Sequence, residues 1–446
     1  MKVCVVGCGY VGLVTALALA RAGHRVVGVE GDDVRRKTIA GGTPPFHEPG
    51  LPELLAGELE AGRFEVTGEI ARAAEAEVVL LAVQTPPEPS GSIDLSYLRN
   101  AAADLVPVLA GRPARRVVAV RSTVVPGTVD GTVAPLFADG NTAVASNPEF
   151  LREGSAVEDG LHPDRVVVGC RDDHGRELLR RLYEPLGAPV IFTEPATAEL
   201  AKYTSNALLA ALISFSNEIG RIAESLPDVD VEDVLGIVHR DRRLSPVING
   251  ETVRPGILAY LKAGCGYGGS CLPKDLSALL AFGRETGQEH PLLEGIRSVN
   301  DSQGRRVVDI AERAVGDLGG RRAAVLGLAF KGGTDDVRSS PALRIIDELL
   351  ERGADVVAYD PLVDAAALPA YAESVAFARS LEEALEGAAV AVVTTNADEF
   401  SGLRSAAEGD PGAGPVIVDG RRALDRAAAD AAVGRGPALT RAPATP

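Results

Sequence analysis

Residues 2–30 read KVCVVGCGYVGLVTALALARAGHRVVGVE, and this stretch decides the fold. Residues 2–6 form a short apolar run that is typical of a buried parallel strand. A glycine-rich turn, a helical pattern over residues 14–23 and a second apolar run over residues 25–30 follow. This order of strand, glycine turn, helix, strand and closing acid is typical of a unit that binds a dinucleotide.

The turn GCGYVG spaces its glycines as GxGxxG. Gly7 would permit a tight turn, Gly9 would let the backbone approach a pyrophosphate, and Gly12 would let the helix pack against the strand. The motif alone is weak evidence. Its place in a complete strand–turn–helix–strand unit makes dinucleotide binding the favoured interpretation.

Glu30 closes the second strand, about 20 residues after the turn. A carboxylate at this position is expected to hold the ribose hydroxyls and to repel a 2′-phosphate, so NAD is favoured over NADP. Arg35 and Arg36 lie close by in the sequence and weaken this preference, because a cation could accept the phosphate.

Further apolar runs at residues 78–83, 116–122 and 143–147, with helical stretches between them, predict a doubly wound α/β domain. Polar segments follow these runs. In open parallel sheets ligands bind beyond the carboxyl ends of the strands, so the segments are expected to line a site, although loops that carry no site are the alternative. The three polar segments are QTPP (84–87), STVVPGT (122–128) and NPEFLREG (147–154).

A second informative stretch, GCGYGGSCLPKDLSALL over residues 264–280, runs from a glycine-rich loop into a predicted helix. Cys271 stands at the junction, where backbone N–H groups and the helix dipole favour a thiolate. Pro273 suits the first helical turn, and Asp275, four residues after the cysteine, is expected to lie beside the sulfur. The alternative is a small buried cysteine at a packed helix start. The flanking glycines and the Lys-Asp pair favour a nucleophile.

Composition limits the classes of function. The 446 residues allow two or three domains, and a formal net charge of -17 argues against nucleic acid or an anionic membrane surface as partner. An anionic substrate would need a local basic pocket.

Five cysteines lack zinc-type spacing, so we expect no metal site and a reduced, cytoplasmic protein. No run reaches the roughly 18 apolar residues of a membrane span, and the chain enters its first strand with no signal-peptide pattern.

One long helix is predicted from Thr197 to about Leu226, long enough to bridge domains or to form a subunit interface. Lys202 and Asn206 are four residues apart and therefore share a face of it. One interpretation is that these two residues belong to a polar stripe exposed to solvent. The apolar residues around them favour the other interpretation, a partly buried helix face. An all-helical region is expected to continue to about Arg313.

A second α/β unit is predicted over residues 321–430, with strands at RRAAVL, DVVAY, AVAVV and VIVD. Its glycine turn, GLAFKGG, lacks the GxGxxG spacing, so a second dinucleotide site is not predicted. The tail over residues 434–446 is rich in Pro, Ala and Gly and is expected to be disordered. The predicted fold is therefore two Rossmann-like doubly wound domains joined by an all-helical region.

The chain resembles the nucleotide-sugar dehydrogenases, most closely the UDP-glucose 6-dehydrogenases. The resemblance covers about residues 1–430 and rests on GCGYVG, EPGL (48–51), QTPP, STV, NPEFLREG, PDR (163–165), the helix with Lys202 and Asn206, GYGGSCLPKD, GLAFKGGTDDVR and DGRR (419–422). It implies an NAD-binding domain over 1–195, a helical dimerisation region over 196–313 and a UDP-binding domain over 321–430, which together enclose one active site. It also implies oxidation of UDP-glucose at C6 to UDP-glucuronate with two NAD.

The implied chemistry needs a group that retains the aldehyde between two hydride transfers, and a thiolate does so as a thiohemiacetal and then a thioester. By resemblance Cys271 is this nucleophile, and Lys202 and Asn206 stabilise oxyanions at C6. Asp275 would position the water that takes the first proton. Glu149 would act as base in hydrolysis, with Thr123 holding the attacking water.

The resemblance also implies contacts with the two ligands. For the nucleotide sugar these are, besides Lys202 and Asn206, Phe150, Leu151, Arg152, Glu153, Arg254, Tyr260, Leu261, Lys262, Gly268, Phe330, Lys331 and Arg421. For NAD they are Gly7, Gly9, Tyr10, Val11, Gly12, Glu30, Arg35, Thr85, Thr123, Glu153 and Arg338.

Two departures from the family pattern leave alternatives open. The segment before the cysteine loop is longer than usual, and Arg254-Pro255-Gly256 stands where Arg-Ile-Gly is expected, so the arginine that reaches a neighbouring subunit is unassigned. GYGGSC after KAG favours UDP-glucose over GDP-mannose or another nucleotide sugar. Outside the family, a two-electron hydroxyacid dehydrogenase and a non-catalytic nucleotide-binding protein are the alternatives.

Overall fold

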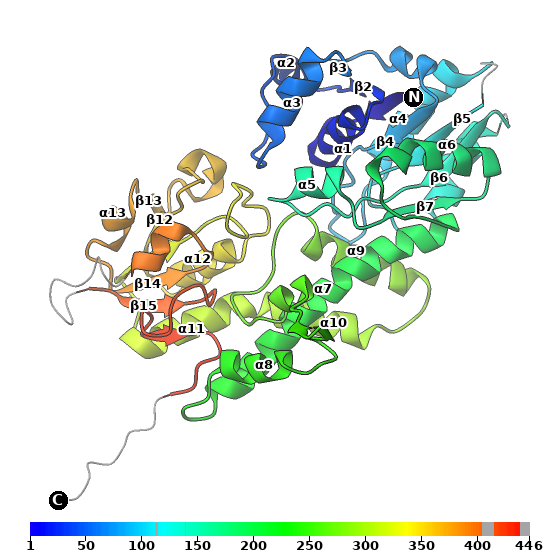
Figure 1. Ribbon diagram of the computed structural model, residues 1–446. Helices are drawn as coiled ribbons and strands as arrows, with labels where there is room; N and C mark the ends of the chain where they lie inside the picture. The colour runs from blue at the N-terminus through cyan, green and yellow to red at the C-terminus, as the bar shows by residue number, and fades with distance from the viewer. Residues whose placement is uncertain (112–114, 139, 404–413, 438–446) are drawn as a thin grey trace, which may run out of the picture. The chain divides into compact units, whose positions relative to one another are not determined.

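The computed structural model describes residues 1–446 except 112–114, 139, 404–413 and 438–446 (Figure 1). The chain divides into two compact units. The first comprises residues 1–205 and 281–287, and the second comprises residues 206–280 and 288–446. Each is described by itself.

The first unit is built on an eight-stranded sheet in the order β3-β2-β1-β4-β5-β6-β7-β8. All neighbouring pairs are parallel except β6 and β7, which are antiparallel. The predicted doubly wound pattern is confirmed, and β3, β7 and β8 extend it beyond the strands predicted from sequence. The strands are β1 Lys2–Val6, β2 Arg25–Val29, β3 Phe64–Thr67, β4 Val78–Leu81, β5 Arg116–Val120, β6 Thr142–Ser146, β7 Val166–Cys170 and β8 Val190–Thr193.

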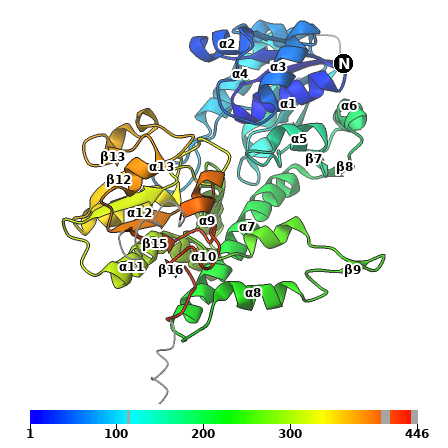
Figure 2. The same ribbon diagram turned by 60° about the vertical axis from the view of Figure 1, so that its left-hand side comes forward.

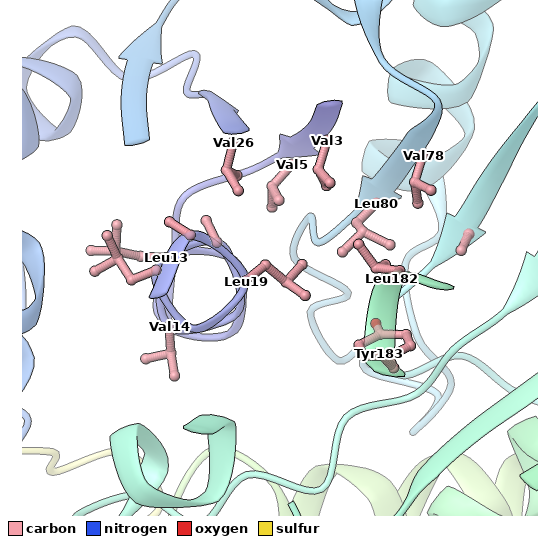
Figure 3. Packing of buried hydrophobic residues seen from close by; sticks show 14 of the residues in the cluster. Val3, Val5, Leu13, Val14, Leu19, Val26, Val78, Leu80, Leu182 and Tyr183 are labelled. Carbon is pink, nitrogen blue, oxygen red and sulfur yellow. The ribbon is translucent and has the colours of Figure 1, made fainter. Parts of the chain in front are cut away.

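Helix α1 is the centre of the first core. Every residue from Gly12 to Ala20 is buried, because the helix packs against β2, α3 and α5 and has no solvent-facing side over this stretch. Figure 3 shows side chains of β1 and β4 directed toward α1 and the end of α6. The helices of this unit are α1 Tyr10–Arg21, α2 Asp33–Ala40, α3 Leu51–Glu60, α4 Ser96–Leu109, α5 Ala156–Leu161 and α6 Asp173–Tyr183.

The strand order reverses between β1 and β4, which lie side by side in the sheet. A reversal of this kind opens a crevice at the carboxyl ends of the strands, where α/β proteins bind ligands. The glycine turn follows β1 and the QTPP segment follows β4, so the topology brings both to the predicted binding edge.

The predicted long helix is α7, Pro195–Glu224, which begins in the first unit and continues in the second. The prediction that the region after it is entirely helical is wrong, because β9 Val247–Ile248 and β10 Glu251–Thr252 form an antiparallel hairpin. Its turn residues Asn249 and Gly250 have φ angles of 52° and 85°, the conformation that Asn-Gly hairpin turns require. Figure 2 shows the hairpin projecting beyond the end of α8. The other helices are α8 Val231–His239, α9 Leu272–Glu285, α10 Pro291–Asp301 and α11 Gln303–Val315.

The predicted second α/β unit is a six-stranded parallel sheet in the order β13-β12-β11-β14-β15-β16. Its core is continuous with that of the central region, since Val307 and Val308 of α11 and Ile345 and Ile346 of α12 belong to one buried cluster. The elements are β11 Arg322–Leu326, α12 Pro341–Glu351, β12 Asp355–Tyr359, β13 Ala376–Phe377, α13 Leu381–Leu385, β14 Val390–Val393, β15 Val416–Asp419 and β16 Ala431–Ala432.

The start of the predicted disordered tail belongs to the fold. Val231 N–H donates to Gly434 O, Gly436 N–H donates to Val229 O and Asp228 N–H donates to Pro437 O. Residues 438–446 lie outside the described residues. Among the helices of the described chain, none combines the length and the hydropathy needed to cross a bilayer.

Candidate active site

The glycine turn after β1 has the geometry of a pyrophosphate cradle. Gly7 has φ +91°, and a Cβ there would lie 2.7 Å from Ala82 O at the end of β4. A Cβ at Gly12 would lie 1.8 Å from Gly7 O, so helix and turn approach too closely for any side chain. Nothing lies within 4 Å of a Cβ at Gly9, which leaves open space above the backbone. These residues therefore fit a dinucleotide in the way the sequence predicted.

Glu30 follows β2 and is buried, and its carboxylate accepts hydrogen bonds from Cys8 N–H (3.0 Å) and Asp32 N–H (2.9 Å). A carboxylate has about four acceptor positions, so these two backbone donors and the Arg35 guanidinium leave one position for a ribose hydroxyl. Arg35 Nη1 lies 3.4 Å from the same carboxylate, and Arg36 pairs with Asp33 at 2.7 Å. Both arginines that could have accepted a 2′-phosphate therefore already face carboxylates.

Replacing Glu30 by alanine should weaken NAD binding by roughly 10–150-fold, the equivalent of a hydrogen bond to a charged group. The variant should also narrow the preference for NAD over NADP, since the repelling charge is lost. Isothermal titration with both dinucleotides measures the two effects. Asp33→Ala is the matched control, because Asp33 is an exposed carboxylate that pairs only with a neighbour on its own helix among the described residues. Unchanged NAD affinity in Glu30→Ala would contradict the assignment.

The loops after β4 and β5 contact one another. Thr85 Oγ1 donates to Thr123 O at 3.0 Å, which joins two of the residues implied as NAD contacts. The loop that begins at Thr123 is also anchored to α7, because the buried Glu199 carboxylate accepts Gly127 N–H (2.6 Å) and Val129 N–H (2.9 Å). Sequence reasoning missed Glu199, since its partners are backbone groups about 70 residues away.

Glu149 and Lys202 form a buried ion pair, with Nζ and Oε1 3.0 Å apart and both side chains about 5% exposed. Glu149 also accepts Leu151 N–H at 2.5 Å. Burial by itself would raise the pKa of the Glu149 carboxyl, but the Lys202 ammonium and the Leu151 N–H outweigh it and hold the pKa below its ordinary value. Glu149 is therefore a carboxylate at neutral pH.

The segment after Glu149 carries the predicted substrate contacts Phe150 to Glu153. The Phe150 ring faces two cations, the Arg165 guanidinium 4.1 Å and the Lys202 ammonium 5.4 Å from its centroid. Arg152, in contrast, is exposed and forms an ion pair with Asp159. A phosphate that used Arg152 would have to compete with this carboxylate.

Cys271 directly precedes α9 and is exposed, whereas Cys4, Cys8, Cys170 and Cys265 are buried. All five cysteines lie in the described chain, and none forms a disulfide. Burial raises the pKa of the Cys4 thiol to about 12 and also raises that of Cys265. Cys271 is thus the cysteine that meets the predicted requirements of exposure and a helix N-terminus.

The glycine loop before Cys271 is closely packed. A Cβ at Gly268 would lie 2.3 Å from Ser339 O, and a Cβ at Gly269, which has φ +81°, would lie 2.8 Å from the Phe330 ring. Gly269 N–H donates to Arg338 O at 3.0 Å. The glycines are therefore required by packing as well as by the turn.

Three buried amides, missed by sequence reasoning, hold this loop from helices α7, α10 and α11. Asn217 Oδ1 accepts Gly264 N–H (2.8 Å), Asn300 Oδ1 accepts Tyr267 N–H (2.8 Å) and Gln303 Nε2 donates to Gly264 O (2.7 Å). These side chains satisfy backbone groups that burial would otherwise leave unpaired. They fix the loop that ends at Cys271.

Asp275 is buried in the first turn of α9, and its N–H donates to Cys271 O at 2.8 Å. Its carboxylate accepts Asn206 Nδ2 at 2.6 Å and Lys274 Nζ at 2.6 Å. The structure therefore joins Asp275 to Asn206, two residues to which the family resemblance assigns catalytic roles. Lys202 lies one turn before Asn206 on α7 and is held by Glu149.

The remaining predicted contacts are spread over the second unit. Arg421 Nη1 donates to Gly266 O (3.2 Å), and Lys262 Nζ donates to Arg422 O (2.7 Å). The Lys331 ammonium lies 5.6 Å from the centroid of the Phe330 ring. Leu261 is buried, Tyr260 is half-buried, Arg338 pairs with Asp336, and Arg254 is exposed just after the hairpin.

The second sheet has its own acid after β12, Asp360, but this group has no comparable spare capacity. Its two oxygens accept the N–H groups of Leu328, Ala329, Leu362 and Val363. Because these four backbone bonds fill the acceptor positions, Asp360 cannot hold a ribose in the manner of Glu30. This supports the expectation of a single dinucleotide site.

Comparison with known proteins agrees with this geometry. Three family models match the chain: the NAD binding domain of the UDP-glucose/GDP-mannose dehydrogenase family over residues 1–187, its central domain over 196–302 and its UDP binding domain over 324–426. The chain belongs to this family. It is therefore an NAD-dependent oxidoreductase of nucleotide sugars, and both the hydroxyacid dehydrogenase and the non-catalytic alternatives are set aside.

Individual relatives are similar over nearly the whole chain. The UDP-glucose 6-dehydrogenase AglM of Haloferax volcanii is 38% identical over 439 residues, covering 96% of this chain and 98% of the relative. A GDP-mannose 6-dehydrogenase of Pseudomonas syringae pv. syringae is 37% identical, covering 82% of each. The solved structure of a UDP-glucose dehydrogenase from Pyrobaculum islandicum is similar with a TM-score of 0.88 and 37% identity, covering 97% of this chain and 96% of that one.

Proposed function

We propose that this dehydrogenase oxidises UDP-glucose at C6 to UDP-glucuronate through a thioester on Cys271. The observation that carries the proposal is the exposed Cys271 at the start of α9, on a loop fixed by three buried amides. The choice of sugar is supported by GYGGSC after KAG and by relatives named as UDP-glucose 6-dehydrogenases. GDP-mannose is the second candidate, because a relative named as a GDP-mannose 6-dehydrogenase is 37% identical to this chain, close to the 38% of the UDP-glucose 6-dehydrogenase AglM.

The reaction removes four electrons in two steps, and two NAD molecules, bound one after the other, would each supply the acceptor for one hydride. In the first step the C6 alcohol loses a hydride and a proton and becomes an aldehyde. The Cys271 thiolate then adds to the carbonyl carbon, which forms the C–S bond of a thiohemiacetal. Loss of the second hydride leaves a thioester, and attack by water breaks the C–S bond, releasing the carboxylate and the thiolate.

The proposed roles of the other groups follow from their charge. Lys202 and Asn206 lie on successive turns of α7 and would stabilise the alkoxides that form at C6. Asp275 is a partner of Asn206, so it would orient that amide as well as the water that takes the first proton. Glu149, kept ionised by Lys202, would accept a proton from the hydrolytic water, with Thr123 helping to hold that water.

Stoichiometry tests the proposal. With limiting UDP-glucose and excess NAD, we expect two NADH per sugar and UDP-glucuronate as the product, measured by absorbance and by mass spectrometry of the nucleotide sugar. A yield of one NADH with a stable aldehyde product would contradict the thioester route. Turnover with GDP-mannose but not with UDP-glucose would replace the substrate and leave the chemistry intact.

We also propose that the enzyme is a homodimer through its central region. Leu208, Phe215 and Ile222 of α7 are seven residues apart, share one face and are each more than half exposed. Exposed apolar side chains that recur on one face of a helix are typical of a protein interface. Phe215→Glu combined with Ile222→Glu should halve the mass measured by light scattering, whereas Leu292→Glu, on α10 and 74% exposed, serves as the control. A wild-type monomer would disprove this proposal.

A further inference from the structure

Glu48 is a buried carboxylate that the proposed reaction does not use. It lies in the EPGL segment before α3 and is 2% exposed. Within the described ranges no lysine, arginine or histidine forms an ion pair with it. A buried charge without a cationic partner is costly unless several donors solvate it, so its hydrogen bonds show what it is there to hold.

The Glu48 carboxylate joins two functional segments of the first unit. Its Oε2 accepts the Tyr10 hydroxyl at 2.5 Å and Gly154 N–H at 2.8 Å, and its Oε1 accepts Ala156 N–H at 2.7 Å. Tyr10 belongs to the glycine turn that cradles the dinucleotide. Gly154 directly follows the segment Phe150 to Glu153, and Ala156 is the first residue of α5, two positions later. One carboxylate oxygen therefore bonds to both segments.

The segment Phe150–Glu153 is bracketed by two buried carboxylates. At its start Glu149 accepts Leu151 N–H, and at its end Glu48 accepts Gly154 N–H. Glu149 pairs with Lys202, whereas Glu48 accepts the hydroxyl of Tyr10 in the glycine turn. Glu48 therefore links the cofactor turn to the backbone at the end of the substrate segment, a link that Glu149 does not make.

Tyr10, which donates the hydrogen bond to Glu48, is held in its protonated form. Burial, and then the hydrogen bond to the Glu48 carboxylate, raise the pKa of Tyr10 well above its ordinary value, so the phenol remains a donor. The Tyr10 ring also packs on Phe46, with centroids 4.9 Å apart, which restricts its rotation. A ligand that further orders Tyr10 must also order the groups that share its acceptor.

We propose that Glu48 is a positioning residue that couples NAD binding at the glycine turn to nucleotide-sugar binding at Phe150–Glu153. The inference rests on the proposed function for the assignment of that segment to the sugar. Ordering by the first ligand reduces the entropy cost for the second, so the coupling is positive and reciprocal. No step of the chemistry passes through Glu48.

The test measures the dissociation constant of UDP-glucose by calorimetry without and with saturating NADH, which prevents turnover. The coupling is expressed as the ratio of the dissociation constant without NADH to the constant with NADH. Coupling between sites commonly changes affinity by about 5–150-fold, and we expect the ratio for the wild type to lie in this range. In Tyr10→Phe and in Glu48→Gln the ratio should fall toward 1. A merely structural role would raise both dissociation constants by the same factor and leave their ratio unchanged.

Two matched variants control for the change of residue. Tyr97→Phe removes an exposed hydroxyl on α4, and Glu53→Gln neutralises an exposed carboxylate on α3. Both should keep the wild-type ratio. Tyr10→Phe keeps the test decisive if Glu48→Gln does not fold, because it removes a single hydroxyl and leaves both backbone bonds of Glu48. A wild-type ratio of 1, or an unchanged ratio in Tyr10→Phe, overturns the inference.

Failure of the proposed function is recognised separately. If UDP-glucose does not bind but GDP-mannose does, the proposed substrate is wrong and the same ratios are measured with GDP-mannose. The coupling is then supported or overturned by the same criteria.

Discussion

Cys271→Ser should lose formation of the acid by at least about 10³-fold in kcat while it still binds NAD, since loss of an activated nucleophile is among the largest effects in enzymes. Serine is a much weaker acid and a weaker nucleophile than cysteine, so the aldehyde is no longer captured. The fold should be intact because Cys271 is exposed and serine is of similar size. Acid production is measured by mass spectrometry of the nucleotide sugar and NAD affinity by calorimetry.

The control for this variant is Cys170→Ser. Cys170 lies in β7 and donates to Asp172 O at 3.4 Å, a bond that a serine hydroxyl can replace. This variant should turn over at the wild-type rate. If Cys271→Ser produced acid at a rate within tenfold of the wild type, the thioester route would be wrong.

Lys202→Met should destabilise the enzyme by about 3–5 kcal/mol at pH 8, because it leaves the buried Glu149 carboxylate without its cation. The loss should be smaller at pH 5. In the wild type the pKa of Glu149 lies below its unfolded value, so the stabilisation is present above that value and is lost as the pH falls through the folded pKa. Without Lys202, burial dominates and raises the pKa, so protonation at low pH relieves the unpaired charge. Urea unfolding at both pH values measures the difference.

The double variant Lys202→Met with Glu149→Gln should recover most of the stability, since it removes both charges, yet remain inactive. Lys2→Met is the matched control. Lys2 pairs with Glu75 at 3.0 Å, both side chains are more than half exposed, and such pairs contribute about 1 kcal/mol or less. Equal stability of Lys202→Met and the wild type at pH 8 would show that the pair does not stabilise the fold.

Local patterns predicted the features whose causes are local. The turn after β1 needs glycine because a Cβ at Gly7 would lie only 2.7 Å from Ala82 O, and the GxGxxG spacing displays that need directly. The position of Cys271 before α9 was readable for the same reason, since the loop glycines and Pro273 mark the helix start. The Asn-Gly turn of the β9–β10 hairpin carried an equally clear signal that the prediction of an all-helical region overlooked.

Features made by distant partners left no such pattern. The antiparallel pairing of β7 with β6 depends on which sheet edge was available, because a short buried run has no direction of its own. Residues 434–437 look like a flexible tail by composition, yet backbone groups near α8 pair with them. Asn217, Asn300 and Gln303 are ordinary polar residues of helices until the glycine loop supplies their partners.

The amino-acid sequence by itself determined the two doubly wound domains, the long helix, the dinucleotide turn and the place of Cys271 at a helix start, because periodicity, glycine spacing and helix starts express interactions among near neighbours. Only the tertiary structure decided that Glu149 is ionised by Lys202, that Asp275 bonds to Asn206 and that Glu48 joins Tyr10 to Gly154. The physical reason is that a buried polar group takes its charge state and its role from the donors that folding brings to it, and these donors lie far away in the chain.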